Sequence, residues 1–445
     1  MTLHLHATPL FSSDHPAPTT EHGLIMVYFA GGGGSSEGIR RATGSDVNYA
    51  INHSRDALGV HAINNANTIH LIEDVWDVDA AALTGGQPVY LAAFSPDCTN
   101  FSRSKNGVRR SRKLRSQIWV VPKTARAVRP RIIFVENVAD IQKYGPLDAK
   151  GFPIREQEGR YYRSFLRQME ALGYTLEARV LNCADYGAAT TRERWCLIAR
   201  CDGQPIVWPE PTHGPANDPR VLSGERQPWI SAGTLIDWTT PSPSVFSAKR
   251  RLCSSTLSRL TNGVSKYHLT RPWFVDQADQ PGERVTASLC TYRRSKTDIG
   301  QDLHRPIRTI TCVDGYALLT MRALPLRTPL TAEQAARAAQ VHAAMRAHVP
   351  PGDWAGQYDD AARQVTFTEN GEQYVIHDLA MRFLTGRELF DLSGFGPEYE
   401  ITRSATGGRV SHRVQVELVG NAVPPPLYEA ITLANAHELR GEAAD

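Results

Sequence analysis

The stretch LIMVYFAGGGGSSEGIRRA, residues 24–42, decides the fold. Its first six residues are apolar and fit a strand buried on both faces, and four glycines follow shortly after. Glycine lets the backbone turn sharply and approach a ligand closely. We expect Ser35 or Ser36 to cap a helix after this loop. The loop is not the dinucleotide fingerprint, because Ser36 stands where its third glycine belongs. A cofactor-binding loop and a tight turn without a ligand both remain open.

Apolar runs and helical patterns alternate over the first 200 residues. Beyond the run at 24–29, we expect buried strands at 47–53, 68–75, 89–95 and 132–138, with helices at 56–64, 113–128 and 161–172. Strands separated by helices predict an α/β fold with a doubly wound, mostly parallel sheet. Ligands of such a sheet bind beyond the carboxyl ends of the strands, so a site is expected in the loops there.

Cys98 lies in one of these loops, within FSPDCTNFS at 94–102. Its neighbours are typical of turns rather than of a core, which favours a nucleophile over an inert buried thiol, provided that something stabilises the thiolate. Five cations follow within twenty residues: Arg109, Arg110, Arg112, Lys113 and Arg115. This cluster is expected to stabilise the thiolate or to contact phosphate, and a solvated helix start fits it equally well.

Glu136 and Asn137 end the otherwise apolar run IIFVENV at 132–138. A carboxylate in such a run costs desolvation energy unless it has a partner or a task. Partial burial is expected to favour the protonated form, which can donate a hydrogen bond or a proton. Capping of the following loop is the alternative.

The composition predicts a soluble globular protein, with 445 residues, 41% hydrophobic and 21% charged. The net charge of +3 is too small to indicate a nucleic-acid partner by itself. The first 22 residues lack the pattern of a signal peptide, and no early apolar run is long enough to span a bilayer, so we expect a cytoplasmic protein. Seven cysteines without CxxC pairs predict neither a disulfide framework nor a metal site.

The pattern changes after residue 200, where residues 201–304 are rich in Pro, Gly, Trp and Arg and lack the alternation of strand and helix. Further on, an Ala-rich helix is predicted at 331–348, capped by Thr331 with Gln334 and ended by two prolines. The predicted organisation is a flexible arm at 1–22, one domain from 23–200 and 376–445, a second, smaller domain at 201–304, and a connecting segment at 305–375.

Taken in order, the loops resemble those of the cytosine-5 DNA methyltransferases over most of the chain. The resemblance rests on FAGGGGSSEG (29–38), SPDCTNFS (95–102), FVENV (134–138), TRERWCLIAR (191–200), RPIRTIT (305–311) and LVGNAVPPPLYEAI (418–431). Each segment alone is a modest signal, but their order is specific. SPDC and VWPEPTHG (207–214) are similar to phage and prophage members.

The resemblance implies an S-adenosylmethionine-dependent enzyme that methylates C5 of a cytosine flipped out of double-stranded DNA. Cys98 would add to C6, Glu136 would hold or protonate N3, and Arg192 and Arg194 would orient the cytosine and a phosphate. The residues implied around the cofactor are Phe29, Gly31, Gly33, Asn52, Asp74 and Asn421. Residues 201–304 would form the target-recognition domain, which reads the major groove. In that domain we expect the tryptophans to be core anchors rather than base contacts: Trp208, Trp229 and Trp238.

Several positions depart from the family pattern: Val27 and Asn52 replace acidic residues, Asp97 replaces a proline, and Thr99 and Thr190 replace glutamines. Asp97 matters most, because an anion next to Cys98 disfavours its thiolate. The segment 321–375 matches nothing in the family and is expected to be an insertion.

Three other readings stay open: a catalytically silent DNA-binding paralogue, an RNA cytosine-5 methyltransferase and a nicotinamide oxidoreductase. The sizeable second domain favours DNA over RNA, and the missing third glycine with the loop cysteine disfavours the oxidoreductase. The expected partners are S-adenosylmethionine and double-stranded DNA, without a metal or a membrane. We expect a monomer in a bacterial or phage-infected cell, in a restriction-modification or phage setting.

Overall fold

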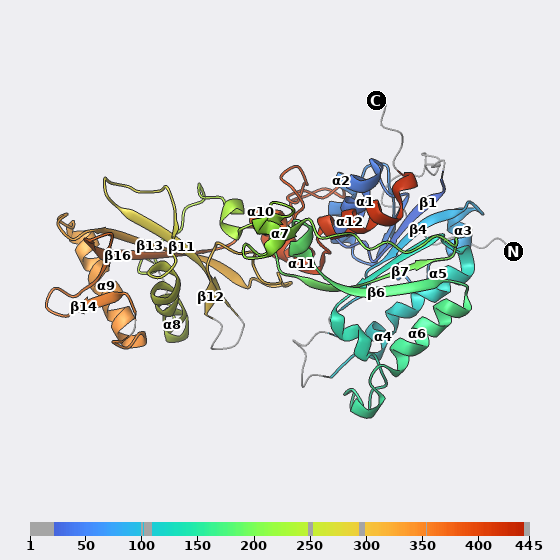
Figure 1. Cartoon of the computed structure of the whole chain (residues 1–445), viewed down its shortest axis with the longest axis horizontal. Coiled ribbons are helices and arrows are strands. Elements are labelled where there is room, and N and C mark those ends of the chain that lie inside the picture. Colours follow the sequence, from blue (N-terminus) through green and yellow to red (C-terminus); the bar gives the residue numbers. More distant parts are fainter. Residues whose placement is uncertain are drawn as a thin grey trace. The chain divides into compact units, whose positions relative to one another are not determined.

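The structure is a computed structural model that describes residues 22–98, 101, 109–247, 252–292, 299–352 and 354–439. The predicted N-terminal arm, apart from His22, lies outside this range, as does Thr99. The chain forms two compact units (Figure 1): the first is Met1–Trp229 with Ser393–Asp445, and the second is Ile230–Leu392. The chain therefore divides at 229/230 and 392/393, not at the predicted positions 200/201, 304/305 and 375/376.

A seven-stranded sheet forms the centre of the first unit, in the order β3-β2-β1-β4-β5-β7-β6. Its strands are β1 (Leu24–Tyr28), β2 (Tyr49–Asn52), β3 (Ile69–Ile72), β4 (Val89–Phe94), β5 (Ile132–Asn137), β6 (Thr175–Asn182) and β7 (Glu193–Arg200). The first five pair in parallel, while β7 runs antiparallel to both β5 and β6. The predicted doubly wound, mostly parallel sheet is confirmed.

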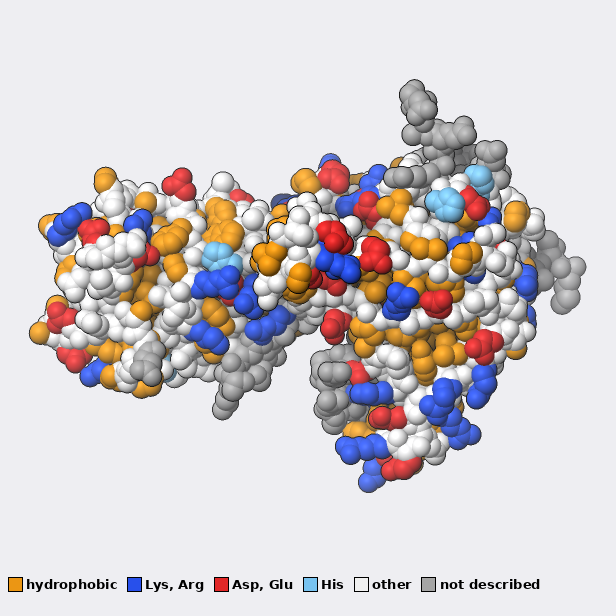
Figure 2. Space-filling view, in the orientation of Figure 1, with side chains coloured by type: hydrophobic (Ala, Val, Ile, Leu, Met, Phe, Trp, Pro, Cys, Tyr) orange, Lys and Arg blue, Asp and Glu red, His pale blue; other side chains and the backbone are white. Residues whose placement is uncertain are grey.

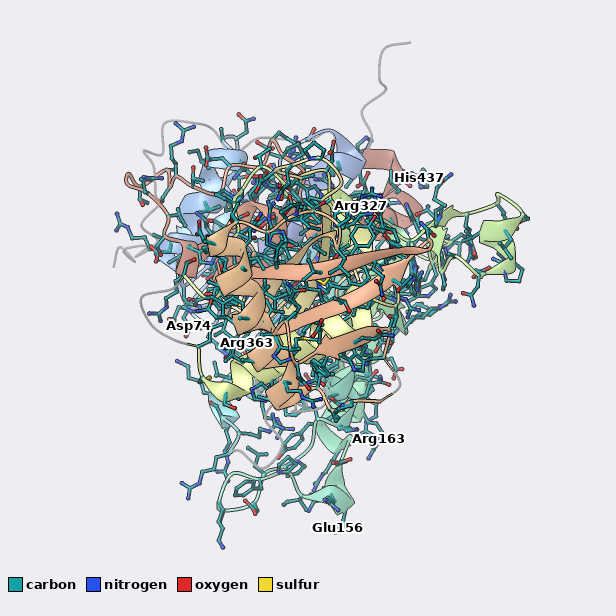
Figure 3. All side chains as sticks on the ribbon, turned by 90° about the vertical axis from the view of Figure 1, so that its left-hand side faces the viewer. Asp74, Glu156, Arg163, Arg327, Arg363 and His437 are labelled. Carbon is teal, nitrogen blue, oxygen red and sulfur yellow. The ribbon has the colours of Figure 1, made fainter. Side chains whose placement is uncertain are left out.

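The helices of the first unit lie between these strands and at the end of the chain. They are α1 (Gly34–Thr43), α2 (Arg55–Asn64), α3 (Ala80–Thr84), α4 (Arg112–Arg115), α5 (Val120–Val128), α6 (Arg160–Ala171), α7 (Pro219–Leu222), α11 (His412–Asn421) and α12 (Pro425–Asn435). The helix predicted at 113–128 is broken by a 3₁₀ turn at Ser116–Trp119. Glu156 and Arg163 lie on the exposed segment that leads into α6 and on the start of that helix (Figure 3).

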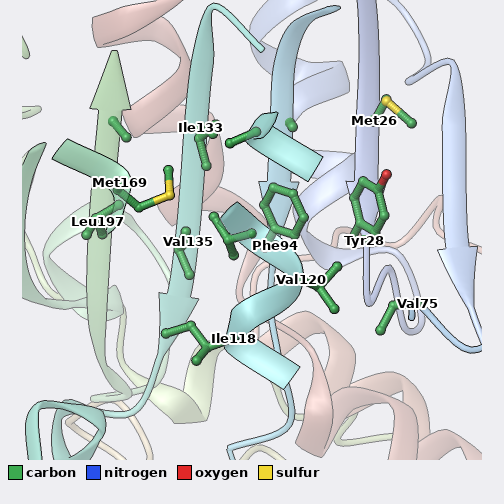
Figure 4. Close-up of a cluster of buried hydrophobic side chains, with 14 of the residues drawn as sticks. Met26, Tyr28, Val75, Phe94, Ile118, Val120, Ile133, Val135, Met169 and Leu197 are labelled. Carbon is green, nitrogen blue, oxygen red and sulfur yellow. The ribbon is translucent and has the colours of Figure 1, made fainter. Parts of the chain in front are cut away.

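Alternate residues of β1 pack on opposite faces of the sheet. Met26 and Tyr28 contact the layer that contains α5 and α6, and the Tyr28 ring stacks on Phe94 with 4.6 Å between centroids (Figure 4). Ile25 and Val27 face the layer of α1 and α12. Burial of each such side chain stabilises the fold by about 1.5–3 kcal/mol. Because both faces of β1 are buried, nearly every residue of the strand is apolar.

The C-terminal segment returns to cover the start of the sheet. A Cβ at Gly38 of α1 would collide with the Pro425 carbonyl oxygen, so only glycine permits this contact between α1 and α12. Residues 38 and 425 are 387 positions apart in the sequence. Their helices, α1 and α12, nevertheless form one layer of the first unit.

An antiparallel sheet dominates the second unit, in the order β10-β11-β13-β16-β15-β14, with β12 paired to β11. Its strands are β10 (Trp273–Phe274), β11 (Arg284–Thr291), β12 (Gly300–Gln301), β13 (Tyr316–Pro325), β14 (Gly356–Asp359), β15 (Gln364–Glu369) and β16 (Glu372–Phe383). Two helices, α8 (Ser254–Gly263) and α9 (Ala332–His348), pack on it, and α10 (Gly386–Leu392) ends the unit.

The predicted Ala-rich helix is confirmed as α9, with the capping box of Thr331 and Gln334 complete. The structure does not show segment 321–375 as an appendage. It supplies the end of β13, all of α9, β14 and β15, and the start of β16, so it forms much of the sheet of the second unit. These strands pair over long sequence separations, which a single-sequence pattern does not reveal.

The prediction that three tryptophans are core anchors of the second domain is wrong for all three. Trp208 and Trp229 belong to the first unit, where their indole nitrogens donate to Glu177 (2.7 Å) and Asp185 (2.9 Å). Trp238 belongs to the second unit and donates to the Gly233 carbonyl. All three side chains are half-buried rather than core anchors.

Within the described ranges, none of the helices is both long and apolar enough to cross a membrane. Nor do these ranges contain a group of three or more His, Cys, Asp or Glu side chains placed to hold a metal ion.

Candidate active site

A pocket of about 270 Å³ lies at the carboxyl ends of the parallel strands of the first unit. Nine of the ten residues predicted for the site line it: Phe29, Gly31, Asn52, Asp74, Cys98, Glu136, Arg192, Arg194 and Asn421. The residues predicted to react and those predicted to bind the cofactor therefore border one cavity. Gly33, the tenth, does not line it.

The glycine loop has two roles in the structure. Gly31, at φ 53°, borders the pocket, and a Cβ there would make only an ordinary contact, 3.8 Å from the Phe29 carbonyl oxygen. Gly33 has φ 96°, and a Cβ there would collide with the Tyr399 hydroxyl, which donates a hydrogen bond to the Gly32 carbonyl (2.7 Å). Gly33 is thus needed for packing against the C-terminal segment and not for direct contact with a ligand.

The predicted serine cap of α1 is wrong. The N-cap residue is Gly33, without a side-chain cap, and Ser36 instead bonds His61 Nε2 at 2.8 Å. His61 Nδ1 lies 2.8 Å from His70 Nε2, which makes a buried chain of three side chains under the loop. Burial lowers the pKa of His61 well below its usual value and that of His70 to about 4, so both rings are neutral at pH 7.

Two side-chain amides hold the loop that carries Cys98. Asn137 Nδ2, at the end of β5, donates to the Pro96 carbonyl at 2.9 Å. Gln117 Oε1 accepts from the Asp97 backbone nitrogen at 3.2 Å. The loop is therefore tied to β5 on one side and to the 3₁₀ turn at Ser116–Trp119 on the other, which fixes the direction of the thiol.

Cys98 is half-buried, and burial raises the pKa of its thiol. The positive charges of Arg194 and Arg192 oppose this shift in pKa, whereas Glu136 and Asp97 reinforce it. The effect expected of Asp97 is confirmed in direction. The cations that stabilise the thiolate are the two arginines at the start of β7.

The basic cluster at 109–115 does not have the predicted thiolate role. Lys113 contacts Asp74 at 3.3 Å. Arg115 is buried, with its guanidinium over the rings of Phe101 and Tyr144. Arg109 and Arg112 are exposed, as is Lys113, and Lys and Arg side chains gather on the part of the first unit that includes α4 and α6 (Figure 2).

Glu136 and Arg194 form a buried ion pair, with Arg194 Nε 2.5 Å from Glu136 Oε1. This partner offsets the desolvation cost expected for a carboxylate in a buried strand. Arg192 is also buried and donates to the Gly420 carbonyl at 2.9 Å. Burial and the charge of Arg194 lower the pKa of Arg192 to about 10, so Arg192 stays cationic at pH 7.

The other end of the pocket is polar and follows β2 and β3. Asn52 Oδ1 accepts from the Ser54 backbone nitrogen (2.8 Å) at the start of α2. Asp74 Oδ1 accepts from the Trp76 nitrogen (3.2 Å), while its second oxygen contacts Lys113. Phe29 lies at the turn into the glycine loop and has a left-handed φ of 59°. This conformation is uncommon for a residue other than glycine, so the surrounding structure must hold the turn in place.

Sequence reasoning missed several residues of the pocket wall, including Gln117, Glu417 and Leu418. Glu417 and Leu418 precede Asn421 by four and three positions, the spacing of one helical turn, and this signal was available in the sequence. Gln117 gave no such signal, because its role depends on the fold of the Cys98 loop.

The fold of the first unit is that of the S-adenosylmethionine-dependent methyltransferases. The model of the C-5 cytosine-specific DNA methylases matches residues 25–436, so the chain belongs to this family. The match extends across both units.

Curated relatives share part of the chain. The type II methyltransferase M.AgeI of Thalassovita gelatinovora is 29% identical over 191 residues, 42% of this chain and 41% of that protein. The type II methylase M.HgiDII of Herpetosiphon aurantiacus is 26% identical over 199 residues, 44% and 51% of the two chains. The matched part of this chain thus spans about half the length of these relatives.

The structure of a DNMT2 mutant from Spodoptera frugiperda has the same fold. Its TM-score is 0.51 at 13% sequence identity, and the superposition covers 91% of this chain and 97% of that one.

Proposed function

We propose that the protein transfers a methyl group from S-adenosylmethionine to C5 of a cytosine in double-stranded DNA. One observation carries the proposal: the Cys98 thiol, the Glu136–Arg194 pair and the glycine loop border the same pocket. A cytosine in a duplex stack does not fit into such a concave site, so the base must be flipped out.

Cys98 acts as the nucleophile. Its thiolate forms a bond to C6 of the cytosine, and the electron pair of the C5–C6 double bond becomes available at C5. The sulfonium of the cofactor supplies the methyl group that C5 accepts. A water molecule then takes the C5 proton, N3 returns its proton to the Glu136 carboxylate, and the Cys98 thiolate departs. The C5–C6 double bond is restored and the enzyme is regenerated.

Glu136 and the arginines support this addition. A proton on the Glu136 carboxyl passes to N3 as the thiolate adds, so no negative charge builds up on the ring, and Arg194 stabilises the carboxylate left behind. Arg192 and Arg194 place two positive charges beside the sulfur and the base, and they favour the thiolate. Both cations are preorganised by burial and by contacts to Gly420 and Glu136.

The residues of the pocket wall have the chemistry needed to bind S-adenosylmethionine. Asn52 and Asp74 supply polar atoms after β2 and β3, where nucleoside hydroxyls dock in doubly wound sheets. Gly31 leaves the backbone open on the pocket side, and Asn421 closes it from α11. These residues form the proposed cofactor site, together with Phe29.

The proposed DNA partner engages both units. The second unit interrupts the first between residues 229 and 393, and we assign base recognition to it, in place of the predicted domain limits 201–304. Exposed cations such as Arg109, Arg112 and Arg163 fit a role in phosphate contact. A monomer in the cytoplasm of a bacterial or phage-infected cell is part of the same proposal.

Bisulfite sequencing of DNA from cells that express the chain tests the proposal. Protected cytosines in one sequence context are expected with the unmodified chain and with the control Cys253→Ser, and none with Cys98→Ser. A chain that binds duplex DNA but leaves every cytosine convertible would be the silent paralogue. Transfer of a labelled methyl group to tRNA and not to duplex DNA would instead favour the RNA enzyme.

A further inference from the structure

The pocket wall contains four acidic side chains: Asp74, Asp97, Glu136 and Glu417. Asp74 contacts Lys113, Glu136 contacts Arg194, and Asp97 also has a partner. Glu417 has no hydrogen-bond or ion-pair partner among the residues that the structure describes. Among these four acidic side chains, Glu417 is therefore the one whose negative charge has no partner in the described residues.

Glu417 lines the pocket, and other residues of its helical turn contact the glycine loop and a residue of the reacting end. Its neighbour Leu418 is the side chain nearest to Gly32, with its Cβ 3.3 Å from where a Cβ at Gly32 would be. Gly420, in the same helical turn, accepts the hydrogen bond from Arg192. This turn of α11 thus joins the loop after β1 to an arginine that acts on Cys98.

The strands on this side provide no other free anion. β1 is wholly apolar, and β2 ends in Asn52, whose amide oxygen is already bonded to the Ser54 nitrogen. If the nucleoside lies at Asn52 and Asp74 and the sulfonium faces Cys98, the amino-acid tail would lie along the glycine loop. Its ammonium group would then be stabilised by an anionic partner, and Glu417, which is exposed at the pocket wall, can supply one.

We propose that Glu417 is a cofactor-binding residue that pairs with the ammonium group of the amino-acid tail of S-adenosylmethionine. This inference rests on the proposed function. Glu417, a side chain of α11, would thus favour a cofactor that carries the amino-acid tail over a nucleoside that lacks it.

Calorimetric titration of the full chain with two ligands tests the assignment. S-adenosylhomocysteine carries the amino-acid tail, and 5′-methylthioadenosine has the same nucleoside without it. For Glu417→Gln we expect the Kd of S-adenosylhomocysteine to rise about tenfold and that of methylthioadenosine to stay within about twofold. The control Glu170→Gln, on the exposed face of α6, should change neither Kd.

The tenfold difference in the Kd of S-adenosylhomocysteine between Glu417→Gln and the unmodified chain should shrink as salt is raised from about 0.05 to about 0.5 M. Salt screens a charge pair at a partly open site. Unchanged affinity for both ligands in Glu417→Gln, or an equal loss for both, would overturn the assignment. If the unmodified chain binds methylthioadenosine and S-adenosylhomocysteine equally, the amino-acid tail has no site here and the assignment also fails. If it binds neither, the proposed function itself fails.

Discussion

Arg194 Nε lies 2.5 Å from Glu136 Oε1, although the two residues come from strands that run in opposite directions. In the parallel part of the sheet, the carboxyl ends of the strands meet at the pocket. Because β7 is antiparallel to β5, its amino end reaches the same edge, and Arg192 and Arg194 arrive there with it. One reversed strand therefore brings two cations to a site otherwise built from strand ends.

We predict that Arg194→Met lowers the free energy of unfolding by about 3–5 kcal/mol, because it leaves the Glu136 carboxylate buried without its partner. Urea denaturation at pH 7 measures this loss, and the double variant Glu136→Gln with Arg194→Met should recover part of it. Arg179→Met, which removes an exposed cation, should cost less than about 1 kcal/mol. Equal losses in the two arginine variants would contradict the importance of the buried pair.

Asp97→Asn should make Cys98 more reactive. The substitution removes an anion that raises the pKa of the thiol, so more thiolate is present at a given pH. Alkylation by iodoacetamide, followed by mass spectrometry of the Cys98 peptide, should accelerate severalfold at pH 8, with the rate–pH curve moved to lower pH.

Cys253 provides the internal control for that experiment. It is exposed, and hydrogen bonds from the hydroxyls of Ser255 and Thr256 lower its pKa to about 7. Cys253 should react first in both proteins and at the same rate. A Cys98 rate that does not respond to Asp97→Asn would show that the neighbouring charge has no influence on the thiol.

Gly33→Ala and Gly31→Ala should separate packing from ligand binding. The first places a methyl group against the Tyr399 hydroxyl at φ 96° and should destabilise the protein by at least about 2 kcal/mol. The second makes only an ordinary contact with the Phe29 carbonyl oxygen and should cost about 1 kcal/mol for its left-handed backbone, while weakening cofactor binding. Thermal unfolding and calorimetry measure the two effects, and similar melting temperatures for both variants would refute this division.

The buried histidines predict acid sensitivity of the glycine loop. The pKa values of His61 and His70 are lower in the folded chain than the usual 6.5, so the unfolded chain binds more protons below that pH. The contribution of the two neutral histidines to the free energy of unfolding is therefore fully present above about pH 6.5 and is lost as the pH falls toward 4. Lowering the pKa of His70 from 6.5 to about 4 corresponds to a loss of about 3 kcal/mol.

Hydrogen exchange of peptides from α2 and β3 follows this loss locally. His70→Gln should flatten the pH dependence in these peptides, whereas His437→Gln, an exposed histidine, should leave it unchanged. A steep acid response that persists in His70→Gln would place its origin elsewhere.

Much of the first unit was predictable because its central strands are buried on both faces. Runs such as LIMVY and IIFVEN are continuous apolar segments, and their limits follow from the polar residues and glycines after them. The edge strand β6 was missed, since its residues are mostly exposed. In the second unit, pairs such as Leu319 with Met381 join distant segments with irregular patterns, so neither its sheet nor its limits could be predicted.

The site shows the same division. Cys98 and Glu136 were identified because each follows or ends a recognisable strand. The contact of Gly33 with Tyr399 and the hydrogen bond from the Asp97 nitrogen to Gln117 were not foreseen. Such contacts depend on how loops fold back on the chain, and that information is absent from local sequence patterns.

The wall of the pocket that includes Leu418 and Asn421 is encoded after the whole second unit. A ribosome must therefore translate the second unit before the cavity can close. Until residues 418–421 have left the exit tunnel, the nascent polypeptide has its Cys98 thiol but only part of the surrounding enclosure. The order of synthesis thus places closure of the pocket after the second unit has been made.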